Sequence, residues 1–189
     1  MKIARKKYLL PIIPFVFVIF LLTGWSQYDN FHVVTDGVIY RSKQLDAKEF
    51  TGYIKKYKIK SVLNLRGEHK NSDWYRDEMN VMEQYRVRHF DFRLSAVREV
   101  DPETLDKIMG IIKNAPKPVL IHCQGGSDRT GLVCAVWKYR EENKEPEAAA
   151  EQLSLVYGHF PYLWSETDAM DRSFRRYVQK KNKLERITE

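Results

Sequence analysis

The sequence predicts an α/β fold in which helices flank a central, mostly parallel sheet of about four strands. Strands are expected over residues 38–40, 60–65 and 119–121, which contain short apolar runs, and over residues 88–94, where Phe90, Phe92 and Leu94 alternate with polar residues. Longer segments with helical periodicity lie between and after them. Gly125 and Gly126 follow the last run and lead into an apolar helix. A strand, a glycine-bearing loop and a helix in this order direct backbone N–H groups and a helix N-terminus at an anion, usually a phosphate.

The helices are expected to begin at capping residues. Asp46, Asp101 and Ser165 precede segments of helical periodicity, as N-cap residues do. Pro102 and Pro146 suit the first turn of a helix. Besides the helix after the glycine loop, helices are expected over residues 46–57, 72–85, 102–112, 147–157 and 165 to about 181. A chain of 189 residues accommodates one such domain and little more.

The N-terminal quarter of the chain has its own organisation. Residues 1–7 form a basic flank, and residues 8–25 carry no charge. Because about 20 apolar residues cross a bilayer and basic flanks stay in the cytoplasm, we expect one transmembrane anchor with a cytoplasmic N-terminus. A linker (26–35), the α/β domain (36–181) and a C-terminal tail (182–189) would then lie in the periplasm or beyond. A cleaved signal peptide is the competing interpretation, although no clear small-x-small cleavage site follows the apolar run.

Charge and composition argue against several function classes. Beyond the four basic residues of the flank, 28 basic residues face 25 acidic ones, an excess too small to indicate nucleic-acid binding. The histidines show no metal-ligand spacing with a cysteine or a carboxylate pair, so no metal is expected. The second of the two cysteines, Cys134, lies in the apolar stripe of a helix and is expected to fill the core.

Cys123 and Arg129 make the glycine loop reactive rather than only anion-binding. Loop amides and the helix dipole favour the thiolate of Cys123, which is a nucleophile for a covalent phospho-cysteine intermediate. The planar guanidinium of Arg129 can hold two phosphoryl oxygens and stabilise the charge that develops in transfer. Thr130 is placed to donate a hydrogen bond to the sulfur, and His122 to orient the loop through hydrogen bonds to its backbone. The residues expected to contact the anion are Gln124, Gly125, Gly126, Ser127 and Thr130.

The pattern H-C-x-x-G-x-x-R-T-G at residues 122–131 resembles the signature of the cysteine-dependent protein tyrosine and dual-specificity phosphatases. The resemblance implies a phosphatase domain with a phosphatase-type phosphate-binding loop, no cofactor and no metal. The segment Y-R-S-x-Q at residues 40–44 is similar to the opening of several small bacterial and fungal members. Arg41 could line the site or form a structural salt bridge, and Arg66, after the next strand, could lie near the pocket rim.

The resemblance also implies a general acid, usually an aspartate upstream of the cysteine strand. Asp91 lies in the corresponding region, but it alternates with apolar residues and could simply occupy the polar face of a strand. Asp128 lies inside the loop, a position that resembles the myotubularin lipid phosphatases and the bacterial triple-specificity phosphatases. Its alternative role is to form a salt bridge with an arginine or to hold the loop shape. Both aspartates remain candidates for proton transfer.

The expected substrate is a phosphoprotein or a phosphorylated small molecule or lipid. Phosphotyrosine is expected first, with phosphoserine and phosphothreonine admitted by a shallow pocket. An inositol phosphate or phosphoinositide is the alternative suggested by the in-loop aspartate, although related lipid phosphatases often carry a lysine in the loop where this chain has Gln124 and Ser127. A phospho-ligand binding module with weak catalysis and a rhodanese-like sulfur carrier are the alternatives from other classes.

Overall fold

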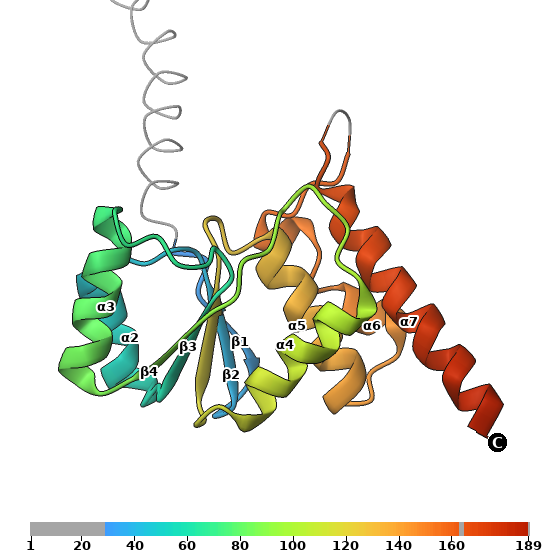
Figure 1. The fold of residues 1–189 in the computed structure, drawn as a ribbon, viewed down its shortest axis with the longest axis horizontal. Coiled ribbons are helices and arrows are strands. Elements are labelled where there is room, and N and C mark those ends of the chain that lie inside the picture. Colours follow the sequence, from blue (N-terminus) through green and yellow to red (C-terminus); the bar gives the residue numbers. More distant parts are fainter. Residues whose placement is uncertain (1–28, 163–164, 189) are drawn as a thin grey trace, which may run out of the picture.

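The computed structural model describes residues 29–162 and 165–188, which form one sheet with helices on both faces (Figure 1). The sheet has five strands in the order β1-β2-β5-β3-β4. Their bounds are β1 His32–Thr35, β2 Ile39–Ser42, β3 Ser61–Asn64, β4 Arg88–Asp91 and β5 Val119–His122. The α/β prediction is confirmed, and the expected number of about four strands was one too low.

Four strands are mutually parallel, and β1 joins the edge of the sheet antiparallel to β2. The central strand β5 lies between β2 and β3, so that His122 pairs with Ser42 on one side and with Asn64 on the other. The carboxyl ends of β2, β5 and β3 therefore meet at one edge. Ligands of open α/β sheets bind outside this edge.

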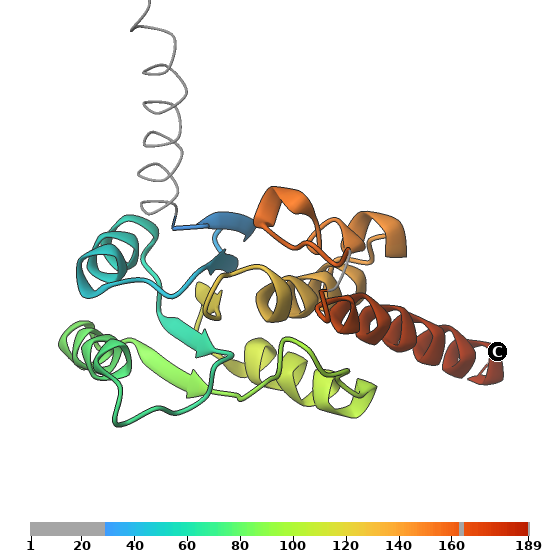
Figure 2. The ribbon, with the colours of Figure 1, turned by 90° about the horizontal axis from the view of Figure 1, so that it is seen from above.

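The helices form two layers, with α2 (Ala47–Tyr57) and α3 (Asp73–Tyr85) on one face and the remaining helices on the other (Figures 1 and 2). The second layer contains α4 Pro102–Asn114, α5 Asp128–Glu141, α6 Pro146–Ala150 and α7 Asp168–Thr188. Each layer closes its own apolar cluster, the smaller one around Phe50 and Val62 beneath α2 and α3. The larger cluster contains Ile121, Leu132 and Cys134. Cys134 is fully buried, as expected, and burial raises the pKa of its thiol to about 11.

Two predicted N-caps are confirmed. The Asp46 carboxylate accepts the backbone N–H of Glu49 at 2.7 Å, and the Glu49 carboxylate accepts the N–H of Asp46 in return. Asp101 accepts the N–H of Thr104 at 2.8 Å, with Pro102 in the first turn of α4. Such side-chain caps satisfy amides that have no partner inside the helix.

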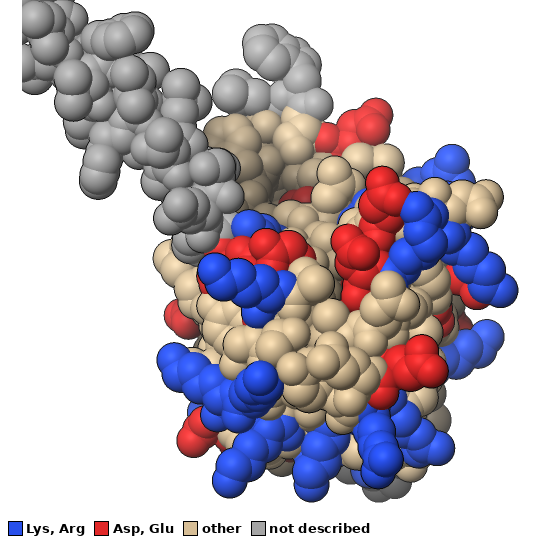
Figure 3. All heavy atoms as spheres, turned by 90° about the vertical axis from the view of Figure 1, so that its left-hand side faces the viewer, with Lys and Arg blue, Asp and Glu red and all other residues tan. Residues whose placement is uncertain are grey.

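Lysine and arginine are interspersed with aspartate and glutamate on the α2–α3 face of the molecule (Figure 3).

The linker prediction over residues 26–35 is wrong in its second half, because residues 32–35 form β1. The strand is short, lies at the sheet edge and buries only Val34, so its pattern is too brief to distinguish it from a linker. The helix predicted over 147–157 is also interrupted. It ends as α6 at Ala150 and resumes only as the 3₁₀ turn Leu155–Tyr157. Just after α6, the Gln152 carbonyl accepts the Arg41 guanidinium at 2.9 Å.

The last helix begins at Asp168, not at Ser165, and continues to Thr188, so the tail predicted over 182–189 is helical as far as the structure describes it. Good helix formers such as Lys183 and Arg186 allow this extension. The apolar run at residues 8–25 lies outside the described residues. Among those that are described, no helix has the length and apolar character needed to cross a bilayer.

Candidate active site

The loop of residues 123–129 leads from the central strand β5 into the helix α5, whose first two residues it includes, at the carboxyl edge of the sheet (Figure 1). Cys123 is its first residue and is 2 % exposed. The preceding carbonyl, that of His122, accepts the backbone N–H of Leu65 from the end of β3 at 2.9 Å. The cysteine is therefore fixed at the centre of the edge, where the predicted nucleophile was expected.

Three successive loop carbonyls are held from outside the loop. The backbone N–H of Gln44 donates to the Gln124 carbonyl at 3.1 Å. The Asn30 amide donates to the Gly125 carbonyl at 2.9 Å, and the Arg41 guanidinium donates to the Gly126 carbonyl at 2.7 Å. In a planar trans peptide, the N–H group points away from the carbonyl to which it is bonded. The N–H groups of residues 125–127 are therefore directed to the inner side of the loop, where an anion would bind.

Gly126 is required by the packing beneath the loop. Its φ is +74°, in the left-handed region, and a Cβ atom would lie 2.6 Å from the carbonyl carbon and oxygen of Ser42. The end of β2 thus approaches the loop too closely for any side chain. The Y-R-S segment and the glycine loop, which are distant in the sequence, therefore pack directly against each other.

Arg41 supports the loop from its outer side and does not line the site. Its side chain is fully buried. Beyond the bond to Gly126, it donates to the backbone carbonyl and the side-chain oxygen of Gln152 at 2.9 and 2.8 Å. Its guanidinium carbon lies 3.9 Å from the ring centre of Tyr157. Of the two roles open from the sequence, Arg41 takes the structural one, through hydrogen bonds to neutral oxygens instead of a salt bridge.

Two further guanidinium groups belong to Arg129 of the loop and to Arg66, which follows β3. Arg129 donates to the Leu94 carbonyl at 3.4 Å, and its buried Nε has no hydrogen-bond partner among the described residues. Arg66 stacks 3.5 Å from the ring centre of Trp74 and donates to the Gln44 side-chain oxygen at 3.0 Å. Burial lowers the pKa of Arg66, and the positive charge of Arg129 lowers it further, whereas Glu78 and Cys123 oppose the shift. Arg66, which follows β3, and Arg129, at the start of α5, thus bring two positive charges to the edge of the sheet where Cys123 lies.

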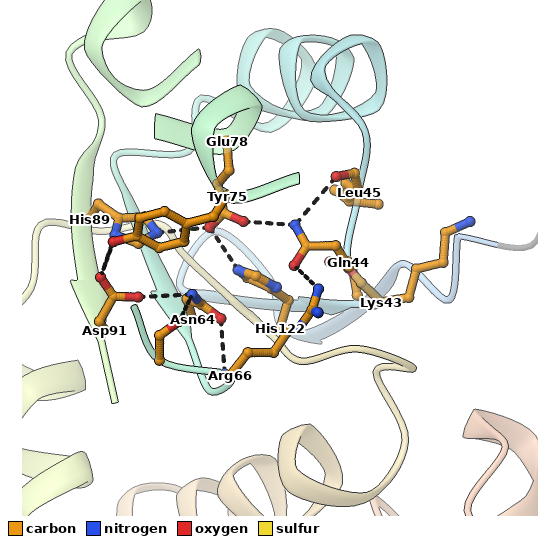
Figure 4. A network of polar contacts seen from close by, with 12 residues as sticks. Lys43, Gln44, Leu45, Asn64, Arg66, Tyr75, Glu78, His89, Asp91 and His122 are labelled. Atoms are coloured by element: carbon orange, nitrogen blue, oxygen red, sulfur yellow. Dashed lines mark hydrogen bonds and ion pairs between the residues drawn. The ribbon is translucent and has the colours of Figure 1, made fainter. Parts of the chain in front are cut away.

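Glu78 of α3 is the centre of the polar network behind the loop (Figure 4). One carboxylate oxygen faces His122 Nε2 at 3.0 Å and His89 Nε2 at 2.7 Å, and the other accepts the Gln44 amide at 2.7 Å. Burial acts to raise the pKa of Glu78, but the charges and hydrogen bonds of the two histidines hold it well below its usual range. The network thus connects the cysteine strand to the Gln44–Arg66 pair.

The predicted bonds of His122 and Thr130 differ from those in the structure. The His122 ring faces Glu78 and not the loop backbone, and its Nδ1 is buried without a partner in the described part of the chain. The prediction failed because nothing local in the sequence identifies a partner 44 residues away. The Thr130 hydroxyl is likewise buried, with no partner among the residues described.

Asp128 begins α5 and is bound by a histidine. Its Oδ1 lies 2.7 Å from His159 Nδ1, and the other ring nitrogen of His159 lies 2.9 Å from Asp171 Oδ2 of α7. His159 is fully buried. Burial alone would lower the pKa of His159, but the hydrogen bonds to the two carboxylates raise it to about 9.

Asp91 ends β4, beyond β3 from the cysteine strand. Its carboxylate accepts the Asn64 amide at 2.8 Å and the Tyr75 hydroxyl at 2.6 Å. Asn64 in turn accepts the backbone N–H of Arg66 at 2.9 Å. Asp91 therefore supports the turn that carries Arg66, and the structure brings Asp128, not Asp91, into the loop itself.

Four residues that hold the site were not identified from the sequence: Asn30, Glu78, His159 and Asp171. Their contacts join parts of the chain separated by 12 to 95 residues. Each is a common polar residue outside any motif, so no local pattern distinguishes it. Together with the loop, they form a buried thiol beneath inward N–H groups and two cations, an arrangement that can bind a phosphoryl group and attack it.

Residues 22–139 match the family model described as "Tyrosine phosphatase family". The fold is similar to that of P. aeruginosa TpbA, with a TM-score of 0.58 at 21% identity over 77% of this chain and 83% of that chain. A TpbA variant in complex with pTyr gives 0.57 at 20% identity, covering 79% and 91%. The core catalytic domain of the PP-IP phosphatase SIW14 from S. cerevisiae, in complex with citrate, gives 0.61 at 23% identity, covering 82% and 94%.

Proposed function

The chain belongs to the tyrosine phosphatase family, and we propose that it hydrolyses phosphotyrosine in proteins through a phospho-cysteine intermediate. The observation that carries this proposal is the orientation of the loop. Donors outside the loop hold its carbonyls on the outer side. The N–H groups of residues 125–127 and the Arg129 guanidinium can then bind three phosphoryl oxygens above Cys123. Phosphoserine and phosphothreonine are secondary substrates of the same chemistry.

In the first step, the Cys123 thiolate attacks phosphorus, an S–P bond forms and the P–O bond to the leaving group breaks. The leaving oxygen takes a proton, for which Asp128 is the first candidate because it lies in the loop, and Asp91 the second. In the next step, water attacks phosphorus, gives up a proton and displaces the thiolate, which releases phosphate. Arg129 and the loop amides stabilise the charge on the equatorial oxygens in both steps.

The solved relatives support two substrate classes. TpbA has been solved with pTyr, and SIW14 is described as a PP-IP phosphatase. Loop residues Gln124 and Ser127 are neutral, whereas a polyanionic inositol phosphate favours additional cations at the loop. This neutrality favours phosphotyrosine, and inositol phosphates are the second candidate.

We also propose that residues 8–25 anchor the phosphatase in a membrane with the N-terminus in the cytoplasm. The basic flank and the uncharged run support this topology. The catalytic domain then lies on the extracytoplasmic side and meets phosphorylated substrates there. A cleaved signal peptide would place it in the same compartment without the anchor.

The test is turnover of a phosphotyrosine peptide by the full chain, beside soluble inositol phosphates and a phosphoserine peptide. We expect turnover of the first substrate, loss below detection in Cys123→Ser, and normal turnover in Cys134→Ser, the matched buried cysteine outside the loop. Asp128→Asn and Asp91→Asn identify the proton donor, since loss of the acid removes one limb of the pH profile. Binding of the peptide without turnover of any substrate would instead favour a binding module.

A further inference from the structure

His159 is enclosed between two carboxylates from different helices. Its Nδ1 faces Asp128 at the start of α5 at 2.7 Å, and its Nε2 faces Asp171 of α7 at 2.9 Å. An ionised carboxylate only accepts hydrogen bonds, so each ring nitrogen carries a hydrogen when both carboxylates are ionised. The imidazole is fully buried and is thus held as the imidazolium cation. The raised pKa of His159, about 9, agrees with this geometry.

The negative charge of Asp128 in the loop calls for a positive charge beside it. Asp128 is one of the residues between Cys123 and Arg129, and its side chain is only 26% exposed. A carboxylate at this position opposes a phosphoryl dianion, because like charges brought together in a partly desolvated site are unfavourable. The loop would then contain one residue that weakens the binding for which its other residues are arranged.

We propose that His159, oriented by Asp171, is a positioning residue that cancels the charge of Asp128 and so lets the loop accept a dianionic phosphoryl group. The inference rests on the proposed function of the loop as a phosphate site. It adds two residues, neither of which contacts the substrate, to the machinery of that site.

The segment that carries His159 is fastened to the loop at two further points. The Asn30 amide that holds the Gly125 carbonyl also donates to the Tyr157 carbonyl at 2.9 Å. Gly158 packs against the loop, since a Cβ atom there would lie 3.1 Å from Ser127 Oγ. The backbone N–H of His159 donates to the Ser154 carbonyl at 3.1 Å. The imidazole therefore keeps its place relative to the loop.

The same pair accounts for the proton that catalysis requires. Asp128 is ionised in this pair, so the proton that it passes to the leaving oxygen is supplied by His159 Nδ1. His159 is then neutral and keeps its Nε2 hydrogen towards Asp171. In the second step, the proton released by water returns through Asp128 to His159, so the cycle closes without a further reactant.

The experiment measures the affinity of the full chain for tungstate, a phosphate-like oxyanion, by calorimetry at pH 7. We expect His159→Gln to weaken binding by about tenfold, since an uncompensated carboxylate then faces the anion. The double variant Asp128→Asn/His159→Gln, which lacks both charges, is expected to return to within about threefold of the wild type. Asp171→Asn is expected to weaken binding less than His159→Gln.

A matched control is Asp106→Asn, which removes the carboxylate bound by Arg140, Tyr177 and Lys181 at another α7 contact and leaves tungstate affinity unchanged. If the double variant binds as weakly as His159→Gln, or if His159→Gln binds as the wild type does, the inference is wrong.

Asp128→Asn alone tests the idea where His159→Gln fails to fold. It leaves the imidazolium paired with Asp171 alone and is expected to bind tungstate at least as tightly as the wild type, whereas a tenfold loss overturns the inference. Tungstate binding without turnover of any phosphomonoester would refute the proposed function and leave this inference standing. Absence of tungstate binding by the wild type would refute both.

Discussion

The chemistry of the loop depends on residues that never reach the substrate. Arg41, Asn30 and the backbone of Gln44 bind the outer carbonyls, and this sets the direction of the inner N–H groups. A donor that is fixed before substrate arrives pays no reorganisation cost during the reaction. At the residue scale, the outer hydrogen bonds are thus as much a part of catalysis as Arg129.

Comparing variants of Arg41 with variants of Arg129 should distinguish support of the loop from catalysis. Arg41→Lys cannot reach the Gly126 and Gln152 oxygens together, so we expect a stability loss of about 3 kcal/mol and a fall in turnover. Arg129→Lys should lower kcat by about 10²–10³ with little change in stability. Urea unfolding and steady-state kinetics on both variants check this. Equal effects of the two on stability would contradict the division of roles.

Gly126 and Gly125 offer a second comparison at this scale. Gly126→Ala places a Cβ atom 2.6 Å from the Ser42 carbonyl at a left-handed φ, so we expect a loss of roughly 2 kcal/mol or more. At Gly125 the nearest atom to a new Cβ is Ser127 Oγ at 3.5 Å, an ordinary contact, and Gly125→Ala should cost less than about 1 kcal/mol. Thermal unfolding of the two variants side by side measures the difference, and similar losses would count against the close packing of β2.

At the scale of the elements, the sequence predicts what local pattern controls. The helices α2 and α4 were located to within two residues, because Asp46, Asp101 and Pro102 mark their starts. Short apolar runs identified β2, β3 and β5, whereas β4 was found from the alternation of Phe90, Phe92 and Leu94 with polar residues. Prediction failed where contacts between distant parts of the chain hold the structure, as at Gln152, whose carbonyl accepts the buried Arg41 guanidinium of β2. The loop residues were identifiable for the same reason as α2, because the residues that define each of them are neighbours in the sequence.

The contact between α5 and α7 should make stability depend on pH. The His159 pKa is about 9 in the folded chain against 6.5 for the free residue, and the groups facing it are Asp128 of α5 and Asp171 of α7. A raised folded pKa contributes stability that is complete below pH 6.5 and is lost as pH rises through 9. We expect the wild type to lose about 2 kcal/mol more than His159→Gln between pH 6.5 and 9.5. Urea unfolding across this range measures both, and parallel curves would refute the contribution.

At the scale of the whole molecule, fold class and family were accessible because one contiguous motif and a strand–helix pattern agree. The domain boundary at residue 36 was not, since β1 is a four-residue edge strand with one buried side chain, and Asn30 acts only through its contacts in the folded chain. The membrane anchor remains a prediction from residues 1–25.

The anchor makes a prediction for the full chain in a bacterial host. We expect it to stay with the membrane fraction after an alkaline carbonate wash, and a variant lacking residues 8–25 to be released. A cysteine introduced by Glu189→Cys should react with a membrane-impermeant maleimide once the outer envelope is opened, while the inner membrane is intact. A shortened, soluble product would show that a signal peptide had been removed instead.

The bond from Asn30 to the loop sets where an isolated catalytic fragment can begin. A fragment cut at residue 36 would lose β1, and β2, whose four residues are all buried, would become the open edge of the sheet. Open edges pair with other chains, so such a fragment should aggregate, besides losing the amide that holds Gly125 and Tyr157. Starting the fragment at or before Asp29 keeps the edge covered. Six or seven residues without a recognisable motif therefore decide whether the fragment is a usable enzyme or an insoluble one.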